Sequence, residues 1–184
     1  DAFGVDWTPD GLRRMAERYG LLILHNLPKT RQALPALKQG NPQAILLMYR
    51  ELYCVLREEN DHQQSVGGYD WIDATHPEWF QLDTKGQRVE IPDYPGRWLM
   101  DLGNPEWQDY WIQRTLRDVV DHGWDGAYAD DVITTVRAHD LPPLATYPDD
   151  ASLQKAVTSF LARAYPVFQQ AGKRFMINAS ETYR

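Results

Sequence analysis

Two adjacent carboxylates, Asp130 and Asp131, follow a short apolar run at residues 126–129 and are the residues best placed to do chemistry. A carboxylate at the end of a buried strand costs free energy unless it is paired or has a function. Hydrolysis of a glycosidic bond uses two carboxyl groups, one acting at the anomeric carbon and one at the leaving oxygen. We therefore interpret the pair as part of a sugar-cleaving site, with Asp130 as the first choice for nucleophile or base. The alternative for Asp130 is a cap of the following segment or an ion pair with an arginine.

The partner carboxylate is harder to assign. Glu181 is the only glutamate just beyond the last apolar run and is a natural general acid, although a solvated residue near a chain end is an equal alternative. Asp131 would point away from Asp130 in an extended segment, so it is a capping or supporting residue. Asp125 precedes its strand, and we expect a structural role for it.

The elements that must position these residues are five short apolar runs that alternate with helical patterns. The runs lie at residues 21–24, 44–49, 98–102, 126–129 and 174–178. Apolar runs alternating with helices predict an α/β fold, with parallel strands covered by helices. Polar residues follow the end of each run, which predicts a site at the carboxyl ends of the strands.

Residues at these strand ends, together with two tryptophans, form the predicted substrate-binding set. The set is His25, Tyr49, Arg50, Asp101, Asp131, Asn178, Trp71 and Trp98. Either Trp71 or Trp98 could stack on a sugar face, but packing in the core is the alternative for each. Asp101 could instead cap the helix that begins after Asn104.

Two closures of a parallel sheet compete. A doubly wound sheet would show a glycine-rich phosphate signature after its first strand, and residues 24–28 contain none. A (β/α)8 barrel needs about 250 residues. We therefore predict a TIM-barrel-like chain, a single partial barrel domain over residues 1–184 with about five of the eight βα units. Residues 51–97 are an inserted excursion, with a helix at 51–63 and a hairpin turning at 83–86.

Composition excludes several classes of protein. The net charge is −7 and the pI is near 5.2, which argues against a nucleic-acid binder. No apolar run reaches the roughly 18 residues that span a membrane. Cys54 is the only cysteine, so no internal disulfide forms and the compartment stays open, with an extracellular or periplasmic location favoured.

The most informative stretches resemble a known class of enzymes. Residues 98–105, Tyr110-Trp111 and residues 123–132 resemble barrel-type glycoside hydrolases of the hypothetical glycosyl hydrolase-like families. The resemblance implies a (β/α)8 barrel that hydrolyses a poly- or oligosaccharide without a cofactor or metal. It also implies a catalytic Asp at the end of the fourth strand, which matches Asp130.

Two other readings stay open. Asp101, Asp130, Asp131 and Glu181 could hold a divalent metal, although the histidine-rich ligand set of zinc sites is missing. Alternatively, the chain is a non-catalytic half-barrel that binds glycans or assembles with copies of itself. Its strand edges would then need covering, which predicts an oligomer or a further domain that completes the barrel.

Overall fold

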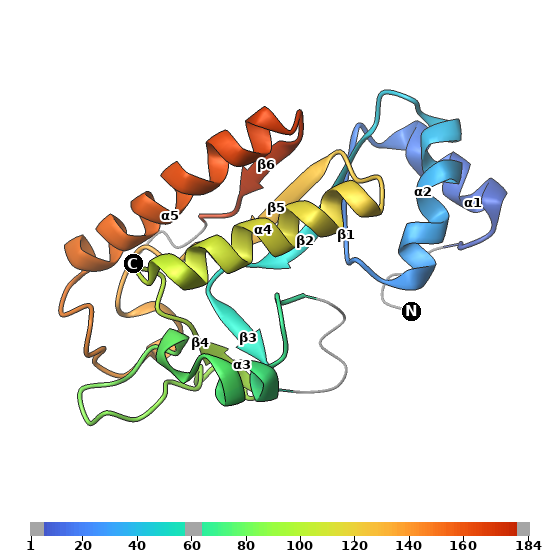
Figure 1. The fold of residues 1–184 in the computed structure, drawn as a ribbon. Helices are drawn as coiled ribbons and strands as arrows, with labels where there is room; N and C mark the ends of the chain where they lie inside the picture. The colour runs from blue at the N-terminus through green and yellow to red at the C-terminus, as the bar shows by residue number, and fades with distance from the viewer. Residues whose placement is uncertain (1–5, 58–63, 180–184) are drawn as a thin grey trace.

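A computed structural model describes residues 6–57 and 64–179, which form an α/β fold around one parallel sheet (Figure 1). The strands are β1 (Leu21–Leu24), β2 (Ile45–Glu51), β5 (Gly126–Asp130) and β6 (Arg174–Ile177), in the order β1-β2-β5-β6. All three neighbouring pairs are parallel. The predicted α/β class with a barrel-like run of βα units is confirmed, and four of the five expected strands lie in this sheet.

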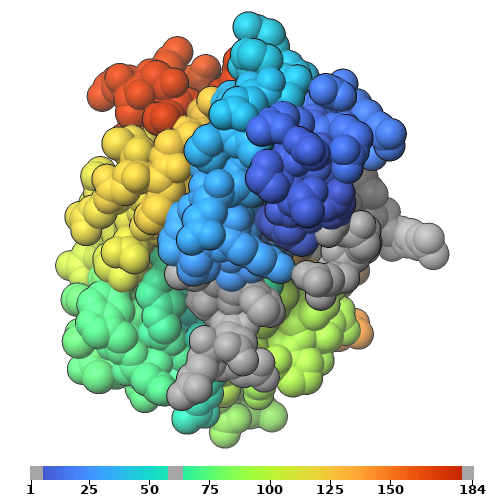
Figure 2. Space-filling model, turned by 90° about the vertical axis from the view of Figure 1, so that its right-hand side faces the viewer, coloured from blue at the N-terminus to red at the C-terminus, as the bar shows by residue number. Residues whose placement is uncertain are grey.

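Helix α1 (Pro9–Arg18) precedes β1, and three of the other helices lie in the connections between strands of this sheet. They are α2 (Pro28–Gly40), α4 (Pro105–Asp121) and α5 (Asp150–Gln170). Helices α4 and α5 run side by side over one face of the sheet (Figure 1). Helices α1 and α2 pack against each other and form much of the face shown in Figure 2. None of the helices in the described parts of the chain is both long and apolar enough to cross a membrane.

Local sequence signals set the boundaries of α4 and β5. The Asn104 side chain accepts hydrogen bonds from the backbone N–H groups of Glu106 and Trp107, which caps the first turn of α4. Gly123 adopts a φ of +77°, which suits a glycine and ends the helix. Gly126 lets β5 approach β6 closely, because a Cβ atom there would lie 2.1 Å from the Arg174 carbonyl oxygen.

The excursion after β2 has its own small sheet. Strands β3 (Cys54–Leu56) and β4 (Arg97–Leu99) pair antiparallel, and α3 (Tyr69–Thr75) and η1 (Pro77–Trp79) lie between them. The short helix η2 (Ala138–Asp140) lies outside the excursion, between β5 and α5. The prediction of a parallel strand at 98–102 is therefore wrong, because that run pairs with β3. The predicted helix at 51–63 is wrong where it is described, since β2 and β3 occupy its start. The hairpin turn at 83–86 is confirmed by the antiparallel bridge between Leu82 and Arg88.

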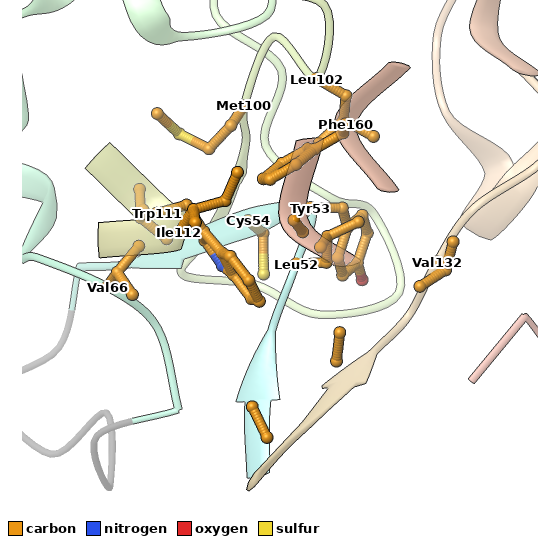
Figure 3. Close-up of a cluster of buried hydrophobic side chains, with 14 of the residues drawn as sticks. Leu52, Tyr53, Cys54, Val66, Met100, Leu102, Trp111, Ile112, Val132 and Phe160 are labelled. Carbon is orange, nitrogen blue, oxygen red and sulfur yellow. The ribbon is translucent and has the colours of Figure 1, made fainter. Parts of the chain in front are cut away.

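The hydrophobic core joins the sheet to α4, α5 and the excursion. Trp111, Phe160 and Tyr53 are all fully buried. Figure 3 shows side chains of α4 and α5 gathered around Leu52, Tyr53 and Cys54, just beyond the end of β2. The excursion is therefore fixed to the same core as the sheet, and the carboxyl end of β2 has a rigid surrounding.

The two faces of the sheet differ. Met48 and Arg50 face α4, so alternation along β2 directs Leu47, Tyr49 and Glu51 to the other face. On that second face the apolar side chains of Leu21, Ile23 and Met176 are 37–39% exposed. In a closed barrel this face would be the interior.

Candidate active site

The register of the sheet brings Glu51 and Asp130 together. Their Cα atoms are partners across the β2–β5 pair, at the carboxyl ends of both strands. Side chains at paired positions of neighbouring strands point to the same face, so the two carboxyl groups are neighbours. Asp130 is partly exposed, and its Oδ1 atom accepts a hydrogen bond of 2.8 Å from the Asn178 amide at the end of β6. The predicted convergence of strand-end residues is present here.

Glu51 occupies an unusual environment for a carboxylate. Its side chain has no exposed surface, and its Oε1 atom accepts from the Tyr49 hydroxyl at 2.9 Å and from the Arg97 guanidinium at 2.5 Å. Its buried Oε2 atom has no hydrogen-bond partner among the residues that the structure describes. Burial raises the pKa of Glu51 to about 7, although Arg97 opposes the rise. This group therefore exchanges a proton near neutral pH.

Asp131 stays close to the same charges. Its φ of +50° lies in the left-handed region, so the chain turns immediately after β5 and is not extended as predicted. Burial and the neighbouring Asp130 raise the pKa of Asp131, while His139 and Arg97 act in the opposite direction. Asp131 in turn raises the pKa of Glu51. Three carboxyl groups therefore share one region with Arg97, and their mutual repulsion favours the protonated forms of Glu51 and Asp131.

Aromatic rings line this group of carboxyls. The His25 ring stacks on Tyr49, with ring centroids 4.8 Å apart and planes 5° apart. Tyr128 lies 6.2 Å from Tyr49 on the neighbouring strand. Burial, followed by the charges of Glu51 and Asp130, raises the pKa of Tyr49, so its hydroxyl remains a hydrogen-bond donor. The predicted positions of His25 and Tyr49 beside Asp130 and Asn178 agree with the structure.

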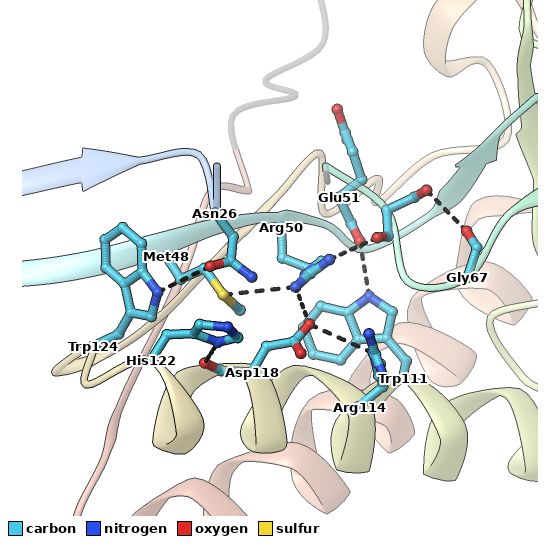
Figure 4. Close-up of polar contacts among 11 residues, drawn as sticks. Asn26, Met48, Arg50, Glu51, Gly67, Trp111, Arg114, Asp118, His122 and Trp124 are labelled. Carbon is cyan, nitrogen blue, oxygen red and sulfur yellow. Dashed lines mark hydrogen bonds and ion pairs between the residues drawn. The ribbon is translucent and has the colours of Figure 1, made fainter. Parts of the chain in front are cut away.

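Arg50 lies on the opposite face of β2 and does not join this cluster. Its guanidinium donates to Asp118 at 2.7 Å and to the Ser65 carbonyl at 2.6 Å. Figure 4 shows Arg50 directed toward α4, whereas the Glu51 side chain points away from that helix. The prediction of Arg50 as a sugar ligand is wrong, since its buried side chain joins the sheet to α4.

Three other predicted ligands have structural contacts elsewhere. Asp101 accepts hydrogen bonds from the Tyr147 hydroxyl and, at 3.0 Å, from the Gly103 backbone N–H. Trp98 packs against Tyr69 at 5.0 Å, and the half-exposed Trp71 stacks on Tyr110 at 5.2 Å. Packing, the alternative stated for both tryptophans, describes their contacts. Asp101 holds a turn at Gly103, whereas Asn104 itself caps α4, so the alternative of Asp101 as a cap is not what the structure shows.

The sequence pointed to neither Glu51 nor Arg97 as a site residue. Glu51 follows an apolar run, so the rule that polar residues at strand ends form the site could have found it. Arg97 comes from the excursion, where no local pattern marks it. Glu181, the predicted general acid, lies outside the described residues.

Asp101, Asp130 and Asp131 do not form a ligand cluster for a metal ion. Within the two described ranges, the only three acidic or histidine side chains close enough to share an ion are His76, Glu78 and Glu106. The three aspartates therefore do not form an ion site by themselves, and Glu181, the fourth residue of that open reading, lies outside the described residues.

The solved structures that resemble this chain show its fold. The glycoside hydrolase domain of PelA from Pseudomonas aeruginosa matches with a TM-score of 0.59 at 15% identity, over 90% of this chain and 55% of that chain. An alpha-galactosidase from Thermus thermophilus matches with a TM-score of 0.61 at 13% identity, over 98% and 37%. A maltogenic alpha-amylase from Thermotoga neapolitana matches with 0.59 at 13%, over 92% and 40%. The fold is therefore that of the (β/α)8-barrel glycosidases, and this chain spans about half the length of those chains or less.

The sequence comparison identifies the family. The profile of hypothetical glycosyl hydrolase family 15 matches residues 38–184. The chain belongs to this family, which confirms the resemblance seen in the sequence. No curated protein sequence matches it significantly.

Proposed function

We propose that this protein is a glycoside hydrolase that cleaves a poly- or oligosaccharide at the carboxyl ends of β2, β5 and β6. Asp130 is the catalytic carboxylate, acting as nucleophile or base. The observation that carries the proposal is the position of Asp130, partly exposed at the end of β5 and oriented by Asn178. Active sites of barrel enzymes gather at this end of the strands.

Glu51 is a positioning residue in this proposal, because its side chain is fully buried and cannot touch a sugar in this arrangement. Tyr49 donates to Glu51, and the charges of both Glu51 and Asp130 act on the Tyr49 hydroxyl. The protonation state of Glu51 therefore changes the electrostatic potential at Asp130. Glu181 remains the candidate general acid, as predicted from its place after the last strand.

The experiment is a screen of the protein on α- and β-linked glycans, with Asp130→Asn as the comparison. Hydrolysis of at least one glycan is expected, with a loss of about 100-fold or more in Asp130→Asn because the substituted amide is a poor nucleophile and base. Turnover that survives Asp130→Asn would rule out the assignment of Asp130. Retention or inversion at the anomeric carbon, followed by NMR, then separates a nucleophile from a base.

A second candidate function rests on the exposed sheet face. Leu21, Ile23 and Met176 expose apolar surface there, and β1 and β6 are edge strands of the described sheet. Such edges pair readily with other strands. We infer that further strands, from added βα units or from a second copy of the chain, pair with these edges and cover this face. If the chain hydrolyses no glycan, a glycan-binding or self-assembling role is the second candidate function. Light scattering measures the oligomeric state. If the chain self-assembles through this face, the parent protein should be an oligomer and Ile23→Lys should be a monomer.

A further inference from the structure

Three metal-ligating side chains meet at the junction of the excursion with α4, away from the strand ends. His76 follows α3, Glu78 lies in η1, and Glu106 lies in the first turn of α4. One donor atom of each lies within 4.8 Å of the other two. Two donors bound to a four-coordinate tetrahedral ion lie about 3.3–3.6 Å apart, given bond lengths of about 2.0–2.2 Å. A small rotation of the two exposed glutamate side chains closes that difference.

The charges of this cluster favour a cation. His76 Nδ1 lies 3.2 Å from Glu78 Oε1, and no Lys or Arg of the described residues forms an ion pair with Glu78 or Glu106. With a neutral imidazole, the cluster carries two uncompensated negative charges. A divalent ion would neutralise both carboxylates, which otherwise repel each other.

A single buried ring orients two of the three side chains. Trp79 stacks on the His76 imidazole, with ring centroids 3.9 Å apart and planes 5° apart. Its indole N–H also donates to Glu106 Oε2 at 3.4 Å. Trp79 is only 3% exposed, so it is a fixed support. Metal ligands are commonly oriented by hydrogen bonds from outside the ligand set, and Trp79 supplies such a contact.

We propose that His76, Glu78 and Glu106 bind one divalent transition-metal ion of the zinc type. One imidazole and two carboxylates suit Zn²⁺ or Co²⁺, and water completes a four-coordinate ion. The ion would join the end of α3 and η1 to the beginning of α4. Its role is structural, and it is independent of the proposed sugar hydrolysis.

The test is a titration of the metal-stripped protein with Co²⁺, followed by displacement with Zn²⁺. Co²⁺ should bind one equivalent, give visible d–d absorption, and quench tryptophan emission because Trp79 touches His76. His76→Ala and Glu106→Gln should each weaken binding by about tenfold or more. His122→Ala is the matched control, since His122 contacts the Asp118 carbonyl and is no member of the cluster, and it should bind as the parent does.

Each outcome decides the proposal. Absence of one-equivalent binding in the parent protein would overturn it, as would unchanged binding in both His76→Ala and Glu106→Gln. Equal loss in His122→Ala would show that binding occurs at scattered histidines. His76→Ala removes a stacked ring, so far-UV circular dichroism checks that this variant folds. If it does not fold, Glu78→Gln takes its place in the titration, because the Glu78 side chain is 55% exposed.

Discussion

The two ends of β5 carry aspartates in opposite situations. At the amino end, Asp125 Oδ2 accepts from the Lys38 ammonium at 2.6 Å and from the Leu46 backbone N–H at 2.8 Å. At the carboxyl end, Asp130 accepts from one neutral amide, and further carboxyl groups lie beside it. Asp125 therefore has the cation and the backbone donor that are typical of a carboxylate that stabilises a fold. Asp130 lies among other carboxyl groups, an arrangement that is typical of functional sites. This contrast explains why Asp130, and not Asp125, is the catalytic candidate.

The largest expected effect concerns the partner of Asp130. Glu181→Gln should lower kcat on unactivated glycosidic linkages by about 10²–10⁴-fold, because it removes a general acid. Aryl glycosides with good leaving groups need no protonation, so their hydrolysis should change little. Steady-state kinetics on both substrate types measure this. Equal losses on both types would contradict an acid role, and Glu17→Gln, at an exposed position of α1, serves as a control for loss of a surface glutamate.

The second effect is a pH dependence of stability. The pKa of Glu51 in the folded protein is about 7, above its ordinary value of 4.5. The folded state therefore binds this proton more tightly, and the associated stability is complete below about pH 4.5 and is lost as pH rises to about 7. The difference between the two values corresponds to about 3 kcal/mol.

Glu51→Gln cannot ionise, so it should lose this part of the pH dependence. Urea unfolding of the parent and the variant at pH 5 and pH 8 measures the change. An identical fall in unfolding free energy in both proteins would show that Glu51 does not titrate in this window.

The third effect tests the amino end of β5. Asp125→Ala removes the acceptor of the Lys38 ammonium and the Leu46 N–H and should cost about 1–3 kcal/mol of unfolding free energy. Thermal unfolding measures the loss. Activity per folded molecule should not change, and a selective loss of activity would erase the contrast between the two ends.

The smallest effect concerns Tyr49. Its hydrogen bond lowers the pKa of Glu51, so Tyr49→Phe should move that pKa above 7 and cost about 1 kcal/mol of stability. Carbon-13 NMR of the Glu51 carboxyl group follows the titration. A pKa that falls in the variant would show that Tyr49 does not stabilise the ionised form.

Local patterns were sufficient for much of the fold. The apolar runs of β1, β2, β5 and β6 and the Asn104 cap of α4 depend on neighbouring residues, and the structure confirms them. The strand-end position also identified His25, Tyr49, Asp130 and Asn178 as neighbours. These residues are adjacent because parallel strands end together, which requires no knowledge of side-chain contacts.

The remaining features depend on contacts between distant residues. The pairing of β3 with β4 redirects the apolar run at 98–102, and the Arg97–Glu51 ion pair joins residues that are 46 positions apart. Arg50 and Glu51 are consecutive polar residues, so the sequence alone did not show which of them faces α4. Arg50 is the one that faces α4, because it forms an ion pair with Asp118 on that helix.

The most direct test of the central claim compares the two ends of β5 in one assay. Initial rates of hydrolysis are measured for the parent protein, Asp130→Asn and Asp125→Asn on the best glycan of the screen, at equal concentrations of folded protein. We predict that Asp130→Asn loses about 100-fold or more in kcat/KM, while Asp125→Asn retains the parent rate. Equal rates for the two variants would contradict the assignment of Asp130 as the catalytic carboxylate.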